Sequence, residues 1–246
     1  MKEKTWMRRC FELARLGAGR VSPNPMVGAV LVSDGRIIGE GYHQAYGEAH
    51  AEVNAIRSVI PEERDLISRS TLYVSLEPCC VYGKTPPCTD LIIRHEIPRV
   101  RVSCLDLSPQ VSGKGIGLLR EAGIDVQVGL LSEEGRKLAS TRTTYVLRKR
   151  PYIILKFAVT SDGIFCPGDE LQYWITQPAT KRLVHRWRSE CDAILVGRKT
   201  AIIDNPRLDN RHFHGPSPLR IVIDPRSTLT DEIELFSGDP PTLRFW

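Results

Sequence analysis

The chain has 246 residues, a formal net charge of +5 and 26% charged residues. This length exceeds the usual size of one domain and favours two. Basic residues are scattered apart from the run 148–150, so composition favours a phosphorylated small molecule at least as well as nucleic acid. No apolar run approaches the roughly 20 residues that cross a bilayer. We therefore expect neither a membrane nor a nucleic acid as partner.

The seven cysteines point to a reducing compartment. Their number is odd, and no charged-then-apolar signal segment opens the chain. A disulfide framework is therefore not expected. We expect the protein to act in the cytoplasm.

The first part of the chain alternates between helical and strand patterns. An amphipathic helix over 1–17 is followed by two apolar runs flanking Asp34-Gly35, a two-residue hairpin signal. The later predictions are helices starting near 50, 88 and 114, a single helix over 132–149, and strands over 71–78, 99–105 and 125–131. This alternation predicts an α/β fold whose largely parallel sheet begins with an antiparallel hairpin and lies between helices.

The basic segment 148–151, Arg-Lys-Arg-Pro, separates the first α/β unit from a second one. The predictions here are a strand over 152–159, a helix over 177–190, a strand over 192–197, a loop over 200–211 and a strand over 219–225. After Pro225 the strand and helix patterns weaken, and the further strand–helix units that an open sheet needs are not found, so the second domain is predicted to be incomplete. The predicted domains are 1–147 and 151–246.

One stretch carries the ligands of a metal site. It contains His50, Glu52, Cys79 and Cys88. One imidazole and two cysteines, with a carboxylate that is not a ligand, are typical of a catalytic zinc site that keeps one position for water. Side chains two residues apart diverge by roughly 200° inside a helix, so the first two can converge only near a helix end. We expect helices to begin at both ends of this stretch and to help hold the cysteines as thiolates.

A structural zinc site, or three ordinary buried polar residues, is the alternative. A structural site closes with a fourth protein ligand, and the nearby choices are Cys80 and His43. Because Cys80 adjoins Cys79, its side chain should point elsewhere, and we interpret it as a small buried thiol. The spacing H-x-E followed by P-C and a second Cys instead matches the zinc nucleobase deaminases.

Longer blocks give the chain a more specific resemblance. They are SPNPMVGAVLV, YGEAHAEVNAI, LEPCCVYGKTPPC, YWIT, VHRWRSECDAILVG and DNPRL. With these blocks the chain resembles the bifunctional riboflavin-biosynthesis deaminase/reductases over nearly its whole length. Eight residues separate Cys79 from Cys88, where cytidine and tRNA-adenosine deaminases typically have two.

The resemblance implies a three-layer, cytidine-deaminase-like first domain. In it, zinc would be held by His50, Cys79 and Cys88, and Glu52 would carry the proton. The substrate contacts implied by the family are Asn24, His43 and Lys84. From the residues alone, these three would be a turn residue, a strand end and a solvated loop tip. Two departures, Val81 for a usual His and Ser108 for a usual Asn, could weaken substrate binding without touching the zinc chemistry.

For the second domain the resemblance implies a dihydrofolate-reductase-like fold that binds NADPH. The cofactor positions would be Ala158, Trp174, Thr200 and Asp204, and the substrate positions Arg188, Leu208 and Arg211. An arginine pair suits a phosphate, although most charges on such a basic helix are simply solvated. Gln172 and Asn205 depart from the family pattern. The family's later glycine-rich segment has no counterpart before Trp246, so we expect a truncated domain or a disabled reductase.

The ligand pattern predicts hydrolytic deamination, and the resemblance implies a phosphorylated pyrimidine as substrate, the phosphoribosylated diaminopyrimidinone formed early in riboflavin synthesis. In the family, NADPH-dependent reduction of the ribosyl group follows. The alternatives are a cytosine or tRNA-adenosine deaminase and a zinc-stapled binding module in which Glu52 is inert. The family's reductase domain commonly pairs, so the resemblance also implies a homo-oligomer.

Overall fold

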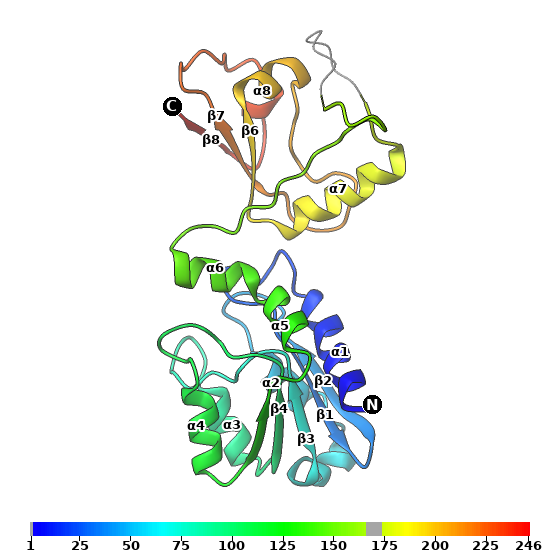
Figure 1. Cartoon of the computed structure of the whole chain (residues 1–246), viewed down its shortest axis with the longest axis vertical. Coiled ribbons are helices and arrows are strands. Elements are labelled where there is room, and N and C mark those ends of the chain that lie inside the picture. The colour runs from blue at the N-terminus through cyan, green and yellow to red at the C-terminus, as the bar shows by residue number, and fades with distance from the viewer. Residues whose placement is uncertain (1, 166–173) are drawn as a thin grey trace. The chain divides into compact units, whose positions relative to one another are not determined.

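The computed structural model describes residues 2–165 and 174–246, which fall into two compact units, Met1–Ile153 and Ile154–Trp246 (Figure 1). Gln172 lies outside the described residues. The elements of the first unit are α1 (Lys2–Arg15), β1 (Gly28–Ser33), β2 (Arg36–Tyr42), α2 (Ala51–Arg57), the 3-10 helix η1 (Pro61–Arg69), β3 (Thr71–Val74), α3 (Cys88–Arg94), β4 (Arg99–Val102), α4 (Lys114–Glu121), β5 (Asp125–Val128), α5 (Ser132–Leu138) and α6 (Ser140–Arg148). No helix in these two described stretches is long and apolar enough to pass through a membrane.

The five-stranded sheet of the first unit has the order β2-β1-β3-β4-β5. β1 pairs antiparallel with β2 and β3, whereas β3, β4 and β5 are parallel. The β1–β2 turn has Asp34 at φ 50° and Gly35 at φ 74°, the two positive values that a type I′ hairpin needs. The predicted hairpin and the parallel sheet that follows it are both confirmed.

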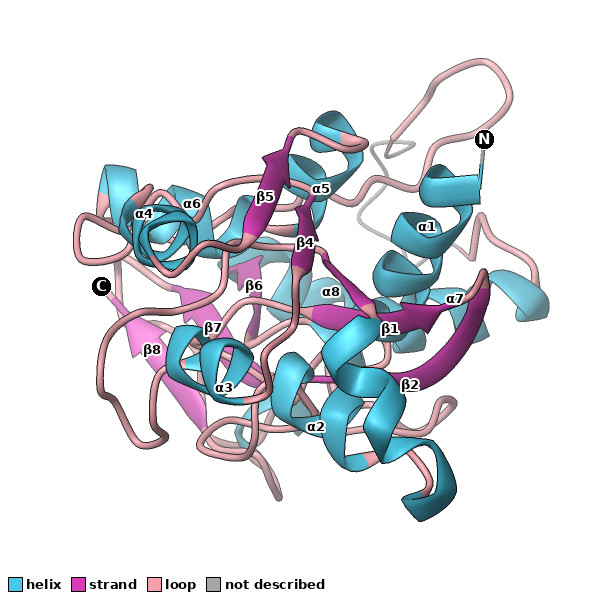
Figure 2. Ribbon diagram, turned by 90° about the horizontal axis from the view of Figure 1, so that it is seen from below, coloured by secondary structure: helices cyan, strands magenta, loops and turns pink. Residues whose placement is uncertain are grey.

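Helices cover both faces of this sheet. Alternate residues of β1 point to opposite sides, and every residue of β1 is buried. Val30 and Val32 pack with Met7 and Phe11 of α1, while Leu31 belongs to the core beneath α2, α3 and α4. α2 and α3 lie on the same side of the sheet (Figure 2). The three-layer prediction is therefore confirmed.

Two glycines of β2 let α2 approach the sheet closely. A Cβ at Gly41 would lie 2.2 Å from the backbone N of Ala55, and one at Gly39 would lie 2.3 Å from the Ala55 carbonyl oxygen. Real Cβ atoms do not come this close to backbone, so only glycine fits at both positions. This contact fixes the first turn of α2, and with it Glu52, relative to the sheet.

Two details of the first unit differ from expectation. The predicted single helix over 132–149 is wrong, because α5 and α6 are separated at Ala139, whose ψ of 2° departs from the helical value near −42°. The 3-10 helix η1 was not foreseen, because its polar sequence lacks an apolar repeat.

The second unit contains a parallel three-stranded sheet of order β6-β7-β8. Its elements are α7 (Pro178–Glu190), β6 (Ala193–Gly197), α8 (Arg198–Asp204), β7 (Leu219–Ile223), the 3-10 helix η2 (Glu234–Phe236) and β8 (Thr242–Phe245). The predicted helix 177–190 and strands near 192–197 and 219–225 are confirmed. The prediction of a second α/β unit is therefore confirmed.

Two expectations for the second unit are wrong, and one strand was not predicted. The apolar run 152–159 forms no strand, because it pairs with none of the described strands, and Leu155 stays 73% exposed. The expected loop 200–211 begins inside α8, which buries Ala201 in the core of the unit. β8 also forms after Pro225, where no element was predicted, because β7 offers it a parallel partner.

A buried histidine joins α7 to the segment after α8. His185 is 4% exposed, and its Nδ1 accepts the backbone N–H of Arg211 at 3.1 Å. Arg188, Arg211 and His212 surround the ring, with Asp209 as the nearby carboxylate. Burial, followed by the charge of Arg188, lowers the pKa of His185 to about 4. The ring is therefore neutral near pH 7, and its Nδ1 is free to accept.

Replacing Gly41 by Ala should destabilise the first unit. Its new Cβ would meet backbone of α2, and overpacking of this kind reduces the free energy of unfolding by about 1–3 kcal/mol. Gly117→Ala in α4 is the matched control, because its Cβ meets no atom within 4 Å, and it should stabilise by about 0.5–1 kcal/mol. Urea unfolding followed by circular dichroism measures both, and equal stabilities would contradict the close packing.

The second unit should lose stability as the pH falls from about 6.5 towards 4. The folded pKa of His185 is near 4 and the unfolded value near 6.5, so the unfolded chain binds more protons in this window. Three of the four tryptophans lie beyond residue 153, so fluorescence reports mainly on this unit. His185→Phe should flatten the dependence of the urea midpoint on pH, and an unchanged slope would contradict this account.

Candidate metal and catalytic site

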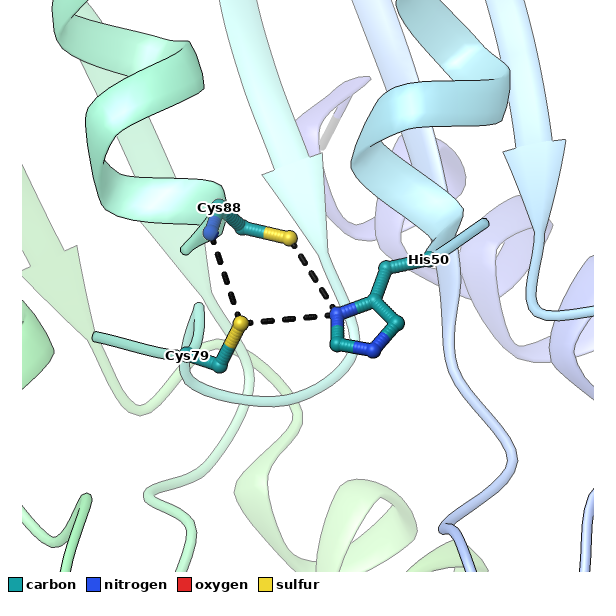
Figure 3. A group of neighbouring side chains, drawn as sticks. All are labelled: His50, Cys79 and Cys88. Atoms are coloured by element: carbon teal, nitrogen blue, oxygen red, sulfur yellow. Dashed lines mark hydrogen bonds between the residues drawn. The ribbon is translucent and has the colours of Figure 1, made fainter. Parts of the chain in front are cut away.

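Three potential ligands converge at one edge of the first sheet. The ligand atoms of His50, Cys79 and Cys88 all lie within 4.8 Å of one another. Nδ1 of His50 is 3.4 Å from the Cys79 sulfur and 3.3 Å from the Cys88 sulfur, so it is the ring atom that faces both (Figure 3). Over residues 2–165 and 174–246, no other group of His, Cys, Asp and Glu meets the same criterion.

The three residues come from two helix starts and one turn. His50 is the N-cap residue of α2, with extended backbone angles, and Cys88 is the first residue of α3. Cys79 follows β3 in an irregular segment, where its sulfur accepts the backbone N–H of Cys88 at 3.3 Å. The expected helix starts are confirmed, and they place side chains that are distant in sequence around one point.

The two sulfurs differ in acidity before any metal binds. Hydrogen bonds from Cys88 and His50 lower the pKa of Cys79 to about 4. The neighbouring Cys79 and burial raise the pKa of Cys88. In the metal-free protein Cys88 therefore holds its proton more strongly than Cys79, and the expectation that both are thiolates on zinc stays a prediction. Ligation by both sulfurs requires the Cys88 proton to leave.

Glu52 lies beside the ligands as a buried carboxylate. It is 3% exposed and is the second residue of α2, directly after the turn that carries His50. Burial, followed by the charge of Cys79, raises the pKa of Glu52. A buried carboxyl group next to a metal cluster can accept and return a proton, which is the role of a general acid–base.

The donor set fits zinc. One imidazole and two cysteine sulfurs are ligands that zinc prefers, and three protein ligands leave one position of a tetrahedron for solvent or substrate. Cys80 does not complete the set, because its sulfur is not among the clustered ligand atoms and lies instead 3.9 Å from the carbonyl oxygen of Gln110. Cys80 is also partly exposed, so the prediction that it is buried is wrong.

His43 fixes the orientation of the Asn24 amide. His43 is buried, and burial lowers its pKa, which keeps the ring neutral. Its Nδ1 lies 3.1 Å from the carbonyl oxygen of Ala49, which can only accept, so the ring proton is on Nδ1. Nε2 must then accept from the Asn24 side chain at 3.1 Å. The Asn24 oxygen is left as an acceptor, and the His43 ring packs edge-on to His50.

The loop between Cys79 and Cys88 folds back onto the His50 ring. Thr85 Oγ1 lies 3.5 Å from Nε2 of His50, on the side of the ring that faces away from the sulfurs. Next to it, Lys84 Nζ lies 4.1 Å from the centroid of the Tyr46 ring. Sequence reasoning missed Thr85 and Tyr46, and their only signal was proximity in the chain to Lys84 and His50.

The two departures from the family pattern have different surroundings. Val81 is 40% exposed, at the start of the loop that carries Lys84. Ser108 is buried, and its hydroxyl oxygen has no hydrogen-bond partner in the described part of the chain. Its backbone N–H donates to the Asp106 carboxylate at 2.7 Å. A longer side chain at 108 would therefore have to be accommodated inside the protein.

The second unit brings its expected substrate residues together. Arg188 Nη1 donates to the carbonyl oxygen of Asp209 at 2.9 Å, and the Arg211 guanidinium pairs with the Asp209 carboxylate. Leu208, at φ 54°, is buried in the core of this unit. Burial and the charge of Arg211 lower the pKa of Arg188. The Asp209 carboxylate also pairs with Arg207 at 3.3 Å, so arginines outnumber carboxylates around Asp209 and leave net positive charge for an anion.

The expected cofactor residues lie on three different segments. Thr200 and Asp204 are one turn apart on α8, whereas Ala158 belongs to the irregular run before residue 166. Trp174 is 65% exposed, and Lys181 Nζ lies 3.7 Å from its ring centroid. Asn205 ends α8 at φ 37°, a conformation that asparagine tolerates better than most residues.

Two family models match the chain. Residues 1–104 match the cytidine and deoxycytidylate deaminase zinc-binding region, and residues 151–245 match the RibD C-terminal domain. The first match contains all three clustered ligands and Glu52. The second contains Arg188, Arg211 and the whole three-stranded sheet.

Relatives match over most of this chain. The riboflavin biosynthesis protein RibD of Aquifex aeolicus is 44% identical over 91% of the chain and 62% of its own length, and that of Actinobacillus pleuropneumoniae is 42% identical over 91% and 58%. The chain thus spans about three-fifths of the length of these curated relatives. A crystal structure from Thermotoga maritima, described as a diaminohydroxyphosphoribosylaminopyrimidine deaminase/5-amino-6-(5-phosphoribosylamino)uracil reductase, superposes with a TM-score of 0.92 at 43% identity, covering 99% of this chain and 69% of that one. The chain therefore belongs to the family of bifunctional riboflavin-biosynthesis deaminase/reductases.

Proposed function

We propose that the first unit is a zinc-dependent deaminase, in a domain over 1–147, and that residues 151–246 form part of a reductase domain. The observation that carries the proposal is the convergence of three zinc-type ligands with the buried carboxylate of Glu52. The substrate proposed is the phosphoribosylated diaminopyrimidinone of riboflavin synthesis, because the family acts in that synthesis.

The reaction replaces an amino group on the pyrimidine by oxygen from water and releases ammonia. Zinc held by His50, Cys79 and Cys88 would supply Lewis acidity next to the reacting carbon. Glu52 accepts a proton from the attacking water and delivers it to the departing amine. Its burial suits this exchange, because a raised pKa brings the carboxyl closer to the working pH.

Substrate recognition is assigned to the residues around the cluster. The Asn24 oxygen, oriented by His43, would accept a hydrogen bond from an N–H of the pyrimidine edge. Lys84 would meet the ribose phosphate as a positive charge on a loop that reaches the cluster through Thr85. His43 then acts through Asn24 and also stands beside His50.

The rival activities make different predictions. A cytosine or tRNA-adenosine deaminase would turn over cytidine or tRNA, and an inert zinc-stapled module would turn over no amine. Side-by-side ammonia assays with the three substrates separate these cases. We propose a reducing cytoplasm as the place of action, since the six described cysteines are all free and the site needs reduced sulfur. Self-association remains a prediction.

For the second unit we propose that Arg188 and Arg211 bind the ribose phosphate of the reductase substrate. The support is that both guanidinium groups bond Asp209, Arg188 at its backbone carbonyl and Arg211 at its carboxylate, and that this carboxylate also pairs with Arg207, so positive charge is in excess. NADPH would be the hydride donor, with Ala158, Trp174, Thr200 and Asp204 at its site. The longer relatives are named for the reduction itself. For this chain we propose only the two phosphate-binding arginines and the four NADPH-binding positions.

Glu52→Gln should reduce ammonia release by about 10²–10⁴-fold, because the amide cannot accept the proton. Zinc content, measured on the same sample, should stay at the wild-type level. Glu48→Gln is the matched control, because it changes an exposed carboxylate a few residues away and should retain full activity. Turnover by Glu52→Gln close to the wild-type rate would refute the assigned role.

Arg188→Ala and Arg211→Ala should each weaken the binding of ribose 5-phosphate about tenfold or more, because a hydrogen bond to a charged group contributes about 1.5–3 kcal/mol. Arg186→Ala is the matched control, since this exposed residue of the same helix pairs with Glu190. Calorimetric titration of the whole chain measures the affinities. If Arg188→Ala and Arg211→Ala bind ribose 5-phosphate as tightly as the control Arg186→Ala, the two arginines do not bind the phosphate.

A further inference from the structure

A second buried carboxylate stands two residues before the ligand Cys79 in the chain and does not belong to the ligand cluster. Glu77 is 4% exposed, and its side chain accepts backbone N–H groups from Gly113 at 3.0 Å and from Asp106 and Ile116 at 3.3 Å. Its own backbone N–H donates to the carbonyl oxygen of Cys104 at 3.0 Å. A buried carboxylate is unfavourable unless it is hydrogen-bonded, and these contacts compensate its burial.

Glu77 supplies the cap that α4 lacks. The N-cap residue of α4 is Gly113, which has no side chain and therefore cannot accept the free N–H groups of the first turn. Glu77 accepts from Gly113 and from Ile116, the third residue of the helix. Gly115 brings α4 closer still, because a Cβ there would lie 2.3 Å from the carbonyl oxygen of Pro78.

The other end of the same turn is bonded to α3. The carbonyl oxygen of Cys79 accepts the N–H of Thr89 at 3.1 Å, and the Cys79 sulfur accepts the N–H of Cys88. The turn 77–79 thus receives N–H groups from the first turns of two helices. β3 ends at Val74, so sheet pairing does not hold Cys79 in place.

We propose that Glu77 is a positioning residue for the metal site, and that its bonds to the start of α4 hold the turn so that the Cys79 sulfur faces His50 and Cys88. This inference rests on the proposed function only for the identity of the metal, zinc. It concerns metal affinity and ligand geometry, and not the transfer of the proton by Glu52.

Glu77→Gln tests the proposal, because the amide keeps the size of the side chain but loses the charge and one acceptor oxygen. Zinc affinity, measured by competition with a chelator, should fall by about 10–100-fold, the range typical of residues that orient metal ligands. The cobalt-substituted protein should show altered absorption bands. Glu77→Asp keeps the charge on a shorter side chain and should recover part of the affinity.

Asp106→Asn is the matched control. It removes the charge from the acceptor of the Ser108 N–H and so weakens a bond of the same segment, while the acceptor on Glu77 is retained, and it should leave zinc affinity and the cobalt spectrum unchanged. If Glu77→Gln does not fold, Gly115→Ala displaces the turn from the α4 side and should lower zinc affinity in the same way.

Wild-type zinc affinity in Glu77→Gln, or in Gly115→Ala where the first variant does not fold, would overturn the proposal. An equal loss in Asp106→Asn would also overturn it, because general loosening of the segment would then explain the effect. A wild-type chain that binds zinc without releasing ammonia would instead refute the proposed deamination and leave this inference standing.

Discussion

Side chains two residues apart on a helix point to different sides, and the candidate active site depends on how the start of α2 avoids this. His50 is the N-cap residue, with extended backbone angles, so its ring turns towards the cysteines while Glu52 enters the first turn. The glycines of β2 let this helix sit directly on the sheet. A change in that contact would move the imidazole and the carboxylate together.

The cysteine side of the site is held by backbone hydrogen bonds. Cys88 starts α3, and Cys79 lies in an irregular turn bonded to the first residues of α3 and, through Glu77, of α4. Both helices follow parallel strands, and such sheets place ligand sites at the carboxyl ends of their strands. The start of α3 therefore gives an N–H group to the Cys79 sulfur, while the N–H groups at the start of α4 are bonded to Glu77.

The local features could be predicted from the sequence. The hairpin at Asp34-Gly35, the alternation of strands and helices and the ligand set all depend on residues near one another in the chain or on a recurrent spacing. Glu77, Thr85 and Tyr46 could not be found in this way, because their contacts are with segments distant in the sequence or formed by a folded loop.

In the second unit, the local sequence pattern predicted one strand wrongly and missed another. Residues 152–159 have the apolar pattern of a strand, yet a strand also needs a partner, and none of the described strands pairs with this run. β8 has a weak pattern of its own but gains a parallel partner in β7. Pairing partners, which a single sequence does not reveal, decided both cases.

Zinc content and ammonia release, measured on one sample of the chain with the phosphoribosylated diaminopyrimidinone, test the central claim most directly. The account predicts one zinc ion per chain and ammonia release that is lost on chelation and restored by zinc. Stoichiometric zinc without ammonia release, or undiminished release from metal-free protein, would contradict it.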